Sequence, residues 1–273
     1  MLKLSTIERF ASNFVTLLED VTITRAKDVK KHGEHDQSSH GSWATGNFDE
    51  EAQGEESQNT YFDKYGMKFL GDGKKEPVGI SREEISALDF YTGDGFSDIN
   101  TFWRRGENET TPDNTSEQVK FEQIEKLSAN LDKLIEESPD FFGDKNLYRV
   151  VGKSLIDELE EGDVFTDKGF MSTTRVDITS EAGLEVLQNL QLLAVGDVRA
   201  SIILPSESKT GKGLAVDFLK NAVSDLFTNV ATANNEKEVL LPRGTTLKFK
   251  GLQTVDAGTD NAMKIAVFQR MDK

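Results

Sequence analysis

The chain has 273 residues, 48 acidic side chains against 32 basic ones, a formal net charge of −16 at pH 7, and no cysteine. This length is enough for one large domain or two small ones, and the missing cysteine excludes disulfides, thiolate metal sites and cysteine nucleophiles. The acidic balance argues against a basic surface that binds nucleic acid. No apolar run reaches the roughly 18 to 20 residues that cross a bilayer. Acidic residues also interrupt the N-terminal segment, so we expect neither membrane insertion nor a signal peptide.

The first 60 residues (1–60) are predicted to form a helix followed by a polar extension. Apolar side chains recur at helical spacing over 4–19, whereas 28–60 is rich in Lys, Gly, Ser, Gln and Glu. So polar a segment buries too little apolar area to offset its ordering entropy, which predicts disorder. The run 31–41 resembles polar segments of phage head-associated proteins, which indicates a phage origin. This run holds all three histidines of the chain, which are His32, His35 and His40. Because the chain has no cysteine and this segment is polar, we do not expect the histidines to bind a metal.

Helices are predicted for residues 61–140. Ser81 and Glu84 have the spacing of a capping box, which predicts a helix from there to about residue 91. A second, short helix is expected around 99–103. A third is predicted from residue 115 to the position before Pro139, because apolar side chains recur every three or four residues and a proline disfavours helix at the residue before it.

Strands are predicted for most of residues 141–273. Short β-type runs with turn residues between them predict seven strands, interrupted by one helix over about 180–192. The expected strands are 147–151, 169–174, 200–204, 214–218, 238–241, 245–250 and 264–269. Because helices come first and strands afterwards, the sequence predicts an α+β fold in which 61–273 forms one domain.

Polar side chains on these strands are candidates for a functional site: Arg149, Ser172, Glu236 and Glu238. Side chains at i and i+2 of an extended chain point to one face, so we expect the two glutamates to face the same space. An acidic pair of this kind can handle positive charge on a substrate or in a reaction. Each candidate alone also has an ordinary structural explanation: an arginine in a surface ion pair, a serine at the end of a strand, or an acidic pair at a solvated strand entrance.

Taken together and in this order, the segments resemble the bacterial exoenzyme type of mono-ADP-ribosyltransferase, which is marked by Arg, then Ser-Thr-Ser, then Glu-x-Glu. The resemblance covers about 80–269. Its pieces are 87–92, 99–100, 147–149, 169–174, 211–213 and 236–245. Two positions depart from the family pattern: Thr174 stands at the third position of Ser-Thr-Ser, and Val150 stands where many relatives have glycine. The resemblance implies two small β-sheets packed around an NAD cleft with an N-terminal helical subregion, NAD as co-substrate, and no metal.

The resemblance also implies a role for each candidate residue. Arg149 would hold the NAD pyrophosphate, since a guanidinium fork matches its oxygens. Val150 would contact nicotinamide through its backbone, and Ser172 with Thr173 would line the NAD site. Glu238 would stabilise the positive charge that builds on the ribose as nicotinamide leaves.

Glu236 is the residue that indicates the acceptor. A protonated arginine needs a carboxylate to orient it and take a proton, and family members with Glu-x-Glu usually modify arginine. We therefore expect NAD-dependent ADP-ribosylation of arginines on a target protein, by a monomer acting in the cytosol of the target cell or delivered with a virion. Two alternatives remain: an NAD glycohydrolase, and an inactive virion-associated structural or binding protein of the same fold.

Overall fold

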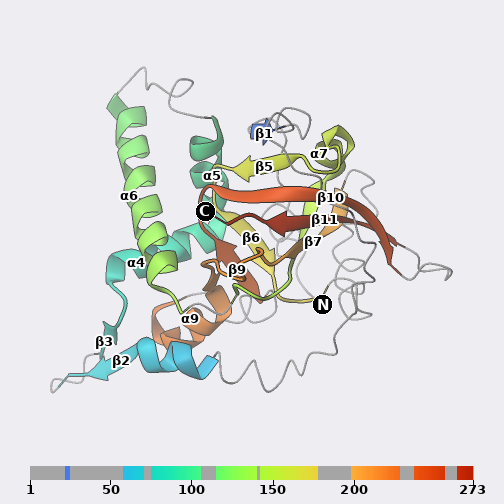
Figure 1. The fold of residues 1–273 in the computed structure, drawn as a ribbon. Helices are drawn as coiled ribbons and strands as arrows, with labels where there is room; N and C mark the ends of the chain where they lie inside the picture. The colour runs from blue at the N-terminus through green and yellow to red at the C-terminus, as the bar shows by residue number, and fades with distance from the viewer. Residues whose placement is uncertain are drawn as a thin grey trace, which may run out of the picture.

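The computed structural model describes residues 22–24, 58–70, 75–105, 115–139, 142–177, 198–227, 237–255 and 263–272. Three helices, α4 Arg82–Phe90, α5 Phe96–Arg105 and α6 Thr115–Glu137, lie toward the left end of the long, twisted sheet in Figure 1. The predicted α+β class is confirmed. The helices expected over 4–19 and 180–192, and the three histidines, lie outside the described residues. No helix in the described part of the chain has the length and apolar character that crossing a bilayer requires.

The helices predicted between Ser81 and Pro139 are confirmed. Both hydrogen bonds of the capping box are present: the Glu84 N–H donates to Ser81 Oγ at 3.2 Å, and the Ser81 N–H donates to Glu84 Oε2 at 2.7 Å. A π-helical turn joins the first helix to the second, and the third helix packs against the first. Their bounds are α4 Arg82–Phe90, η2 Tyr91–Gly95, α5 Phe96–Arg105 and α6 Thr115–Glu137.

The main sheet has nine strands in the order β1-β5-β10-β11-β7-β4-β6-β9-β8. Its strands are β1 Thr22–Thr24, β4 Leu147–Gly152, β5 Val164–Asp167, β6 Met171–Thr174, β7 Val198–Leu204, β8 Leu214–Ala215, β9 Glu238–Leu241, β10 Thr245–Val255 and β11 Met263–Arg270. A separate two-stranded hairpin consists of β2 Gly66–Phe69 and β3 Lys75–Val78.

Two groups of strands make up this sheet, and a single residue pair joins them. Between the described strands β4 and β6, Tyr148 pairs with Thr174 and the register contains no further pair. On one side lie β1, β5, β10, β11, β7 and β4, and on the other lie β6, β9 and β8. The two small sheets that the resemblance implied are joined into one nine-stranded sheet, because the two groups of strands remain paired at this seam.

Several elements differ from the prediction. The strand expected over 214–218 is a strand only at Leu214–Ala215, and the chain then turns into helix α9 Val216–Ala222. A short apolar run fits either period, so the pattern alone could not separate the two. The sequence analysis also missed the helical residues 58–64, the β2–β3 hairpin, β5, and helix α7 Lys153–Glu158. Residues 22–24, expected to lie outside the folded part, pair with β5.

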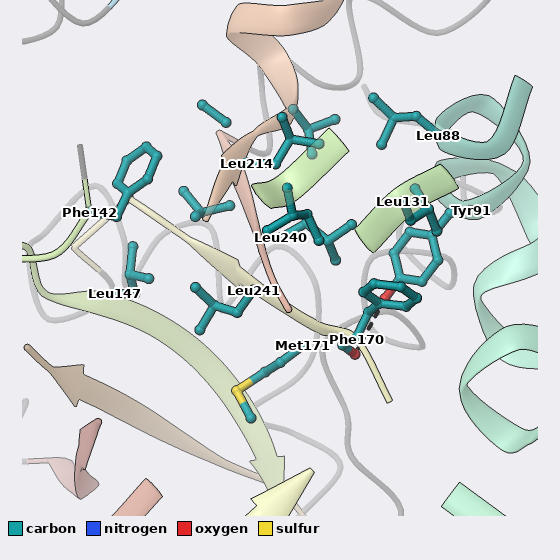
Figure 2. Close-up of a cluster of buried hydrophobic side chains, with 14 of the residues drawn as sticks. Leu88, Tyr91, Leu131, Phe142, Leu147, Phe170, Met171, Leu214, Leu240 and Leu241 are labelled. Atoms are coloured by element: carbon teal, nitrogen blue, oxygen red, sulfur yellow. Dashed lines mark hydrogen bonds between the residues drawn. The ribbon is translucent and has the colours of Figure 1, made fainter. Parts of the chain in front are cut away.

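The core fills the space between the helices and the β6-β9-β8 group. Figure 2 shows Leu88, Tyr91 and Leu131 from the helical part near Phe170, the residue before β6, and Leu240 of β9. All five side chains are buried, and the ring of Tyr91 packs edge-on against that of Phe170 with centroids 5.6 Å apart. This packing brings the end of α4 against the strands that carry the candidate site residues.

Candidate active site

Three candidate residues lie on three strands of the sheet: Arg149 on β4, Ser172 on β6 and Glu238 at the start of β9. Glu238 lies directly opposite Thr174, and Ser172 is two residues from Thr174 on the same strand. Directly opposed residues share a face and side chains alternate along a strand, so Ser172 and Glu238 project from the same face. All three candidates are at most 3% exposed.

Tyr91 lies between these residues. Its hydroxyl is 3.4 Å from Ser172 Oγ, donates to the Phe170 carbonyl at 3.4 Å, and accepts a hydrogen bond from Asn100 Nδ2 at 3.1 Å. Burial and, next in size, the negative charge of Glu238 raise the pKa of Tyr91 to about 12. The phenol therefore stays neutral at physiological pH and acts as a hydrogen-bonding group.

The guanidinium of Arg149 is buried in the same region. Burial lowers the pKa of Arg149 to about 10, against the opposing effect of the Asp167 carboxylate, with smaller contributions from Arg104 and Tyr91. A pKa of about 10 leaves the side chain positively charged at neutral pH. Thr174 pairs with Tyr148, the residue before Arg149, and also with Glu238, so the structure brings Arg149, Ser172 and Glu238 to neighbouring positions on adjacent strands.

A second set of polar contacts holds the turn before β6. Arg104 donates two hydrogen bonds of 2.9 Å to the two carboxylate oxygens of Asp167. Asp167 Oδ1 also accepts the Gly169 N–H at 2.9 Å, and Asn100 Oδ1 accepts the Phe170 N–H at 2.8 Å. A Cβ at Gly169 would lie 2.7 Å from Asn100 Oδ1, so only glycine allows α5 to approach this closely.

The sequence analysis gave no role to Tyr91, Asn100, Arg104 or Asp167. The first two lie in segments that carried the family resemblance, so that resemblance was the available signal. Asp167 ends β5, a strand that was not predicted. The contacts of Arg104 and Asp167 join positions 63 residues apart, which no local pattern reveals.

Two of the remaining candidates are buried in the sheet. Thr173 is fully buried, and its Oγ1 donates to the Val239 carbonyl at 2.7 Å, so this hydroxyl binds the neighbouring strand. Val150 is 3% exposed in the middle of β4.

Glu236 lies outside the described residues, and the chain after it is not extended. The strand begins at Glu238, and Lys237 has φ of +44°, in the left-handed region. The argument that the two glutamates share a face because the chain is extended between them is therefore wrong: a left-handed residue interrupts the alternation of side chains.

The sequence profile of the ADP-ribosyltransferase exoenzyme family matches residues 58–271. The chain belongs to this family. Its members use NAD as a substrate, so membership supports a transferase, and the resemblance inferred from the sequence is confirmed. No curated protein sequence matches the chain.

Solved structures of bacterial exoenzymes are similar to this chain at low identity. Plx2a, an ADP-ribosyltransferase toxin from Paenibacillus larvae, is 14% identical over 81% of this chain and 94% of its own, with a TM-score of 0.48. The Clostridium limosum C3 exoenzyme is 15% identical over 80% and 93%, with a TM-score of 0.49. The Vis toxin of Vibrio splendidus is 16% identical over 83% and 88%, with a TM-score of 0.47.

Proposed function

We propose that this protein transfers ADP-ribose from NAD to arginine side chains of a target protein. The observation that supports the proposal is the strand register: Thr174 pairs with Tyr148, the residue before Arg149, and with Glu238, and Ser172 lies two residues away on the same strand. A buried cation and a buried carboxylate on neighbouring strands suit a substrate with a negative pyrophosphate at one end and a sugar that becomes positive at the other.

Arg149 is suited to the pyrophosphate of NAD. Its side chain is buried and charged, and a guanidinium offers paired donors to phosphate oxygens. Hydrogen bonds between ions strengthen where water is excluded. Binding of the dinucleotide would also compensate the burial that now lowers the pKa of this arginine.

Glu238 is suited to the reacting sugar. As the bond between nicotinamide and C1′ of the ribose breaks, its electron pair leaves with nicotinamide and positive charge spreads over the ring. A carboxylate fixed beside the ring stabilises that charge without reorganising. Ser172 lies on the same face of the sheet as Glu238, and the hydroxyl of Tyr91 holds it in place.

Glu236 would serve the acceptor. It would orient the guanidinium of the target arginine and take one proton from it, while the arginine nitrogen forms a new bond to C1′. Because this step is separate from the loss of nicotinamide, the two glutamates should be separable by mutation.

The test compares Glu238→Ala with Glu236→Ala in two assays, nicotinamide release without acceptor and transfer of labelled ADP-ribose to an arginine-rich protein. Glu238→Ala should lose both activities, whereas Glu236→Ala should keep nicotinamide release and lose transfer. Asp157→Asn, which alters an exposed acid on α7, serves as the control and should change neither. Arginine modification that survives in Glu236→Ala would contradict the role given to that residue.

NAD glycohydrolysis is the second candidate function. The described contacts of Arg149, Ser172 and Glu238 would serve water as acceptor equally well. Rapid nicotinamide release by the native protein, with no label on any arginine of a host lysate, would favour this alternative.

A further inference from the structure

A kink separates helices α4 and α5. Gly93, in the π-helical turn that joins them, has φ of −85° and ψ of −123°, which are not helical angles. Tyr91 lies before Gly93 and Asn100 lies after it, yet Asn100 Nδ2 donates to the Tyr91 hydroxyl at 3.1 Å. The same hydroxyl is 3.4 Å from Ser172 Oγ. The shape of the kink therefore decides whether these side chains meet beside Ser172.

The side chain of Thr92 binds this kink to two other parts of the protein. Thr92 directly follows Tyr91 and is 4% exposed. Its Oγ1 donates to the Leu88 carbonyl of α4 at 2.8 Å and accepts a hydrogen bond from Lys220 Nζ at 2.6 Å. One hydroxyl thus joins the last turn of α4 to a lysine 128 positions further along the chain.

Lys220 is buried inside the protein. It is 1% exposed, and its Nζ lies 5.2 Å from the centre of the Phe227 ring. Lysine side chains are seldom buried so completely, because removing an ammonium group from water costs free energy. Packing alone does not require an amino group at this position, since methionine has a similar length. The hydrogen bond to Thr92, in contrast, requires a donor there.

Helix α9 connects Lys220 to the strands of the candidate site. The helix begins directly after β8, and β8 pairs with β9. Helix α9 also contacts β9, whose first residue is Glu238. The bond from Lys220 to Thr92 therefore holds the kink against the part of the sheet that carries the carboxylate.

From this geometry we propose that Lys220 is a positioning residue for the cleavage of NAD. It holds Thr92, and with it the kink, so that the Tyr91 hydroxyl stays beside Ser172. The inference rests on the proposed function, and it applies with arginine or water as acceptor because nicotinamide leaves in both cases. A displacement of about 1 Å in a positioned group can change a rate by up to about 100-fold, so this bond can affect catalysis without touching the substrate.

The experiment uses the full chain with two substitutions that break the bond from opposite sides. Lys220→Met keeps the side-chain length and removes the donor, and Thr92→Val keeps the shape and removes the acceptor. In each variant kcat for nicotinamide release should fall about fivefold, while the KM for NAD stays within about twofold of the native value. Thr92→Ser keeps a hydroxyl for Lys220 and should recover most of kcat. Thr92→Val alone carries the test if Lys220→Met does not fold.

A Tyr91→Phe background shows whether the effect of Lys220 passes through Tyr91. Once the positioned hydroxyl is gone, adding Lys220→Met should lower kcat by less than about twofold. The double variant of Lys220→Met and Thr92→Val should likewise lose no more than either single variant, because both remove the same bond.

A matched control lies on α6. Ser128 is fully buried, its Oγ donates to the Ile124 carbonyl at 2.7 Å, and it accepts a hydrogen bond from Trp103 Nε1 at 2.8 Å. Ser128→Ala therefore removes a buried helix hydroxyl with the same two kinds of bond as Thr92. It should lower the denaturation midpoint as Thr92→Val does, and it should leave kcat and KM at their native values.

Tyrosine labelled with ¹³C at Cζ separates this inference from the proposed function. The chain has four tyrosines, and Tyr91→Phe identifies the signal of Tyr91. That signal should move in Lys220→Met and in Thr92→Val, while the signal of Tyr148 on β4 stays in place. If the native protein released no nicotinamide, the proposed function would fail, and a moved Tyr91 signal would still support the role of Lys220 in placing Tyr91.

Three results would overturn the inference. The first is an unmoved Tyr91 signal in folded Lys220→Met or Thr92→Val, whatever the activity. The second is a native kcat in these folded variants. The third is a further loss of about fivefold when Lys220→Met is added to Tyr91→Phe, because Lys220 would then act by another route.

Discussion

Asp167 and Arg104 are joined by two parallel hydrogen bonds of 2.9 Å, with the aspartate fully buried and the arginine side chain 14% exposed. The same carboxylate binds the Gly169 N–H and raises the pKa of Arg149 against the larger effect of burial. The Asp167 carboxylate therefore holds the turn before β6 and also favours the charged form of Arg149, the residue proposed to bind the pyrophosphate.

Asp167→Asn should destabilise the fold and weaken NAD binding. Breaking a buried ion pair leaves an uncompensated charge, so we expect a loss of about 3 kcal/mol in the free energy of unfolding. Denaturant unfolding measures this loss, and calorimetry with NAD measures binding. Asp157→Asn, at an exposed pair with Lys153, should change stability by less than about 0.5 kcal/mol.

Tyr91→Phe should lower kcat about tenfold with little change in stability, because the ring stays in the core while Ser172 loses its neighbour. Steady-state kinetics of nicotinamide release tests this. Tyr65→Phe is the matched control, since the Tyr65 hydroxyl is buried and has no hydrogen-bond partner among the described residues. An equal effect of both substitutions would show that the contact between the Tyr91 hydroxyl and Ser172 does not contribute to kcat.

Gly169→Ala should displace Asn100, because the added Cβ would lie 2.7 Å from Asn100 Oδ1 and 3.2 Å from Arg104 Nε. We expect a destabilisation of about 1 to 3 kcal/mol and a fall in activity, since Asn100 binds the Tyr91 hydroxyl. Thermal unfolding and nicotinamide release are the measurements. Gly66→Ala, where a Cβ meets nothing within 4 Å, should shift stability by no more than about 0.5 kcal/mol.

Glu84→Gln should remove a stabilising effect that depends on pH. Burial raises the pKa of Glu84, but the hydrogen bonds from Lys133 and Ser81 together lower it by more than burial raises it. The pKa of Glu84 therefore lies below its usual value. A lowered carboxyl pKa gives stability that is complete above the unfolded pKa and is lost as pH falls through the folded one. The native protein should be more stable than Glu84→Gln by about 1 kcal/mol at pH 7.

The difference in the free energy of unfolding between the native protein and Glu84→Gln should vanish in strong acid, because the Glu84 carboxyl is then protonated in both the folded and the unfolded state. Urea unfolding across a pH series checks it. Glu83→Gln, at the exposed neighbouring position, should follow the native curve throughout. A difference between the native protein and Glu84→Gln that persisted unchanged in acid would exclude the charge as its cause.

Local patterns were sufficient for helices α4, α5 and α6 and for most strands. The Ser81–Glu84 spacing predicted the start of α4, and the strand expected over 238–241 is β9 Glu238–Leu241. These elements can be predicted because their caps and apolar runs lie within a few residues of one another in the sequence. The same reasoning failed at 214–218, where three residues of the run pack as the first turn of α9.

The companions of the candidate site could not be found this way. Tyr91 meets Ser172 across 81 positions, and its pKa depends on a glutamate still further along the chain. The left-handed Lys237 was equally hidden, because glycine and asparagine are the residues that mark such a position and lysine does not. Tertiary packing sets both features, and a single sequence does not record it.

The seam between β4 and β6 has a consequence for how such a protein diversifies. Arg149 lies in one group of strands and Ser172 and Glu238 in the other, and among the described strands Tyr148 and Thr174 form the paired position between β4 and β6. A single paired position, and not a long backbone ladder, therefore joins the strand of the guanidinium to the strands of the hydroxyl and the carboxylate. Substitutions at Tyr148 or Thr174 would therefore alter this junction while the pairings within each group of strands remain.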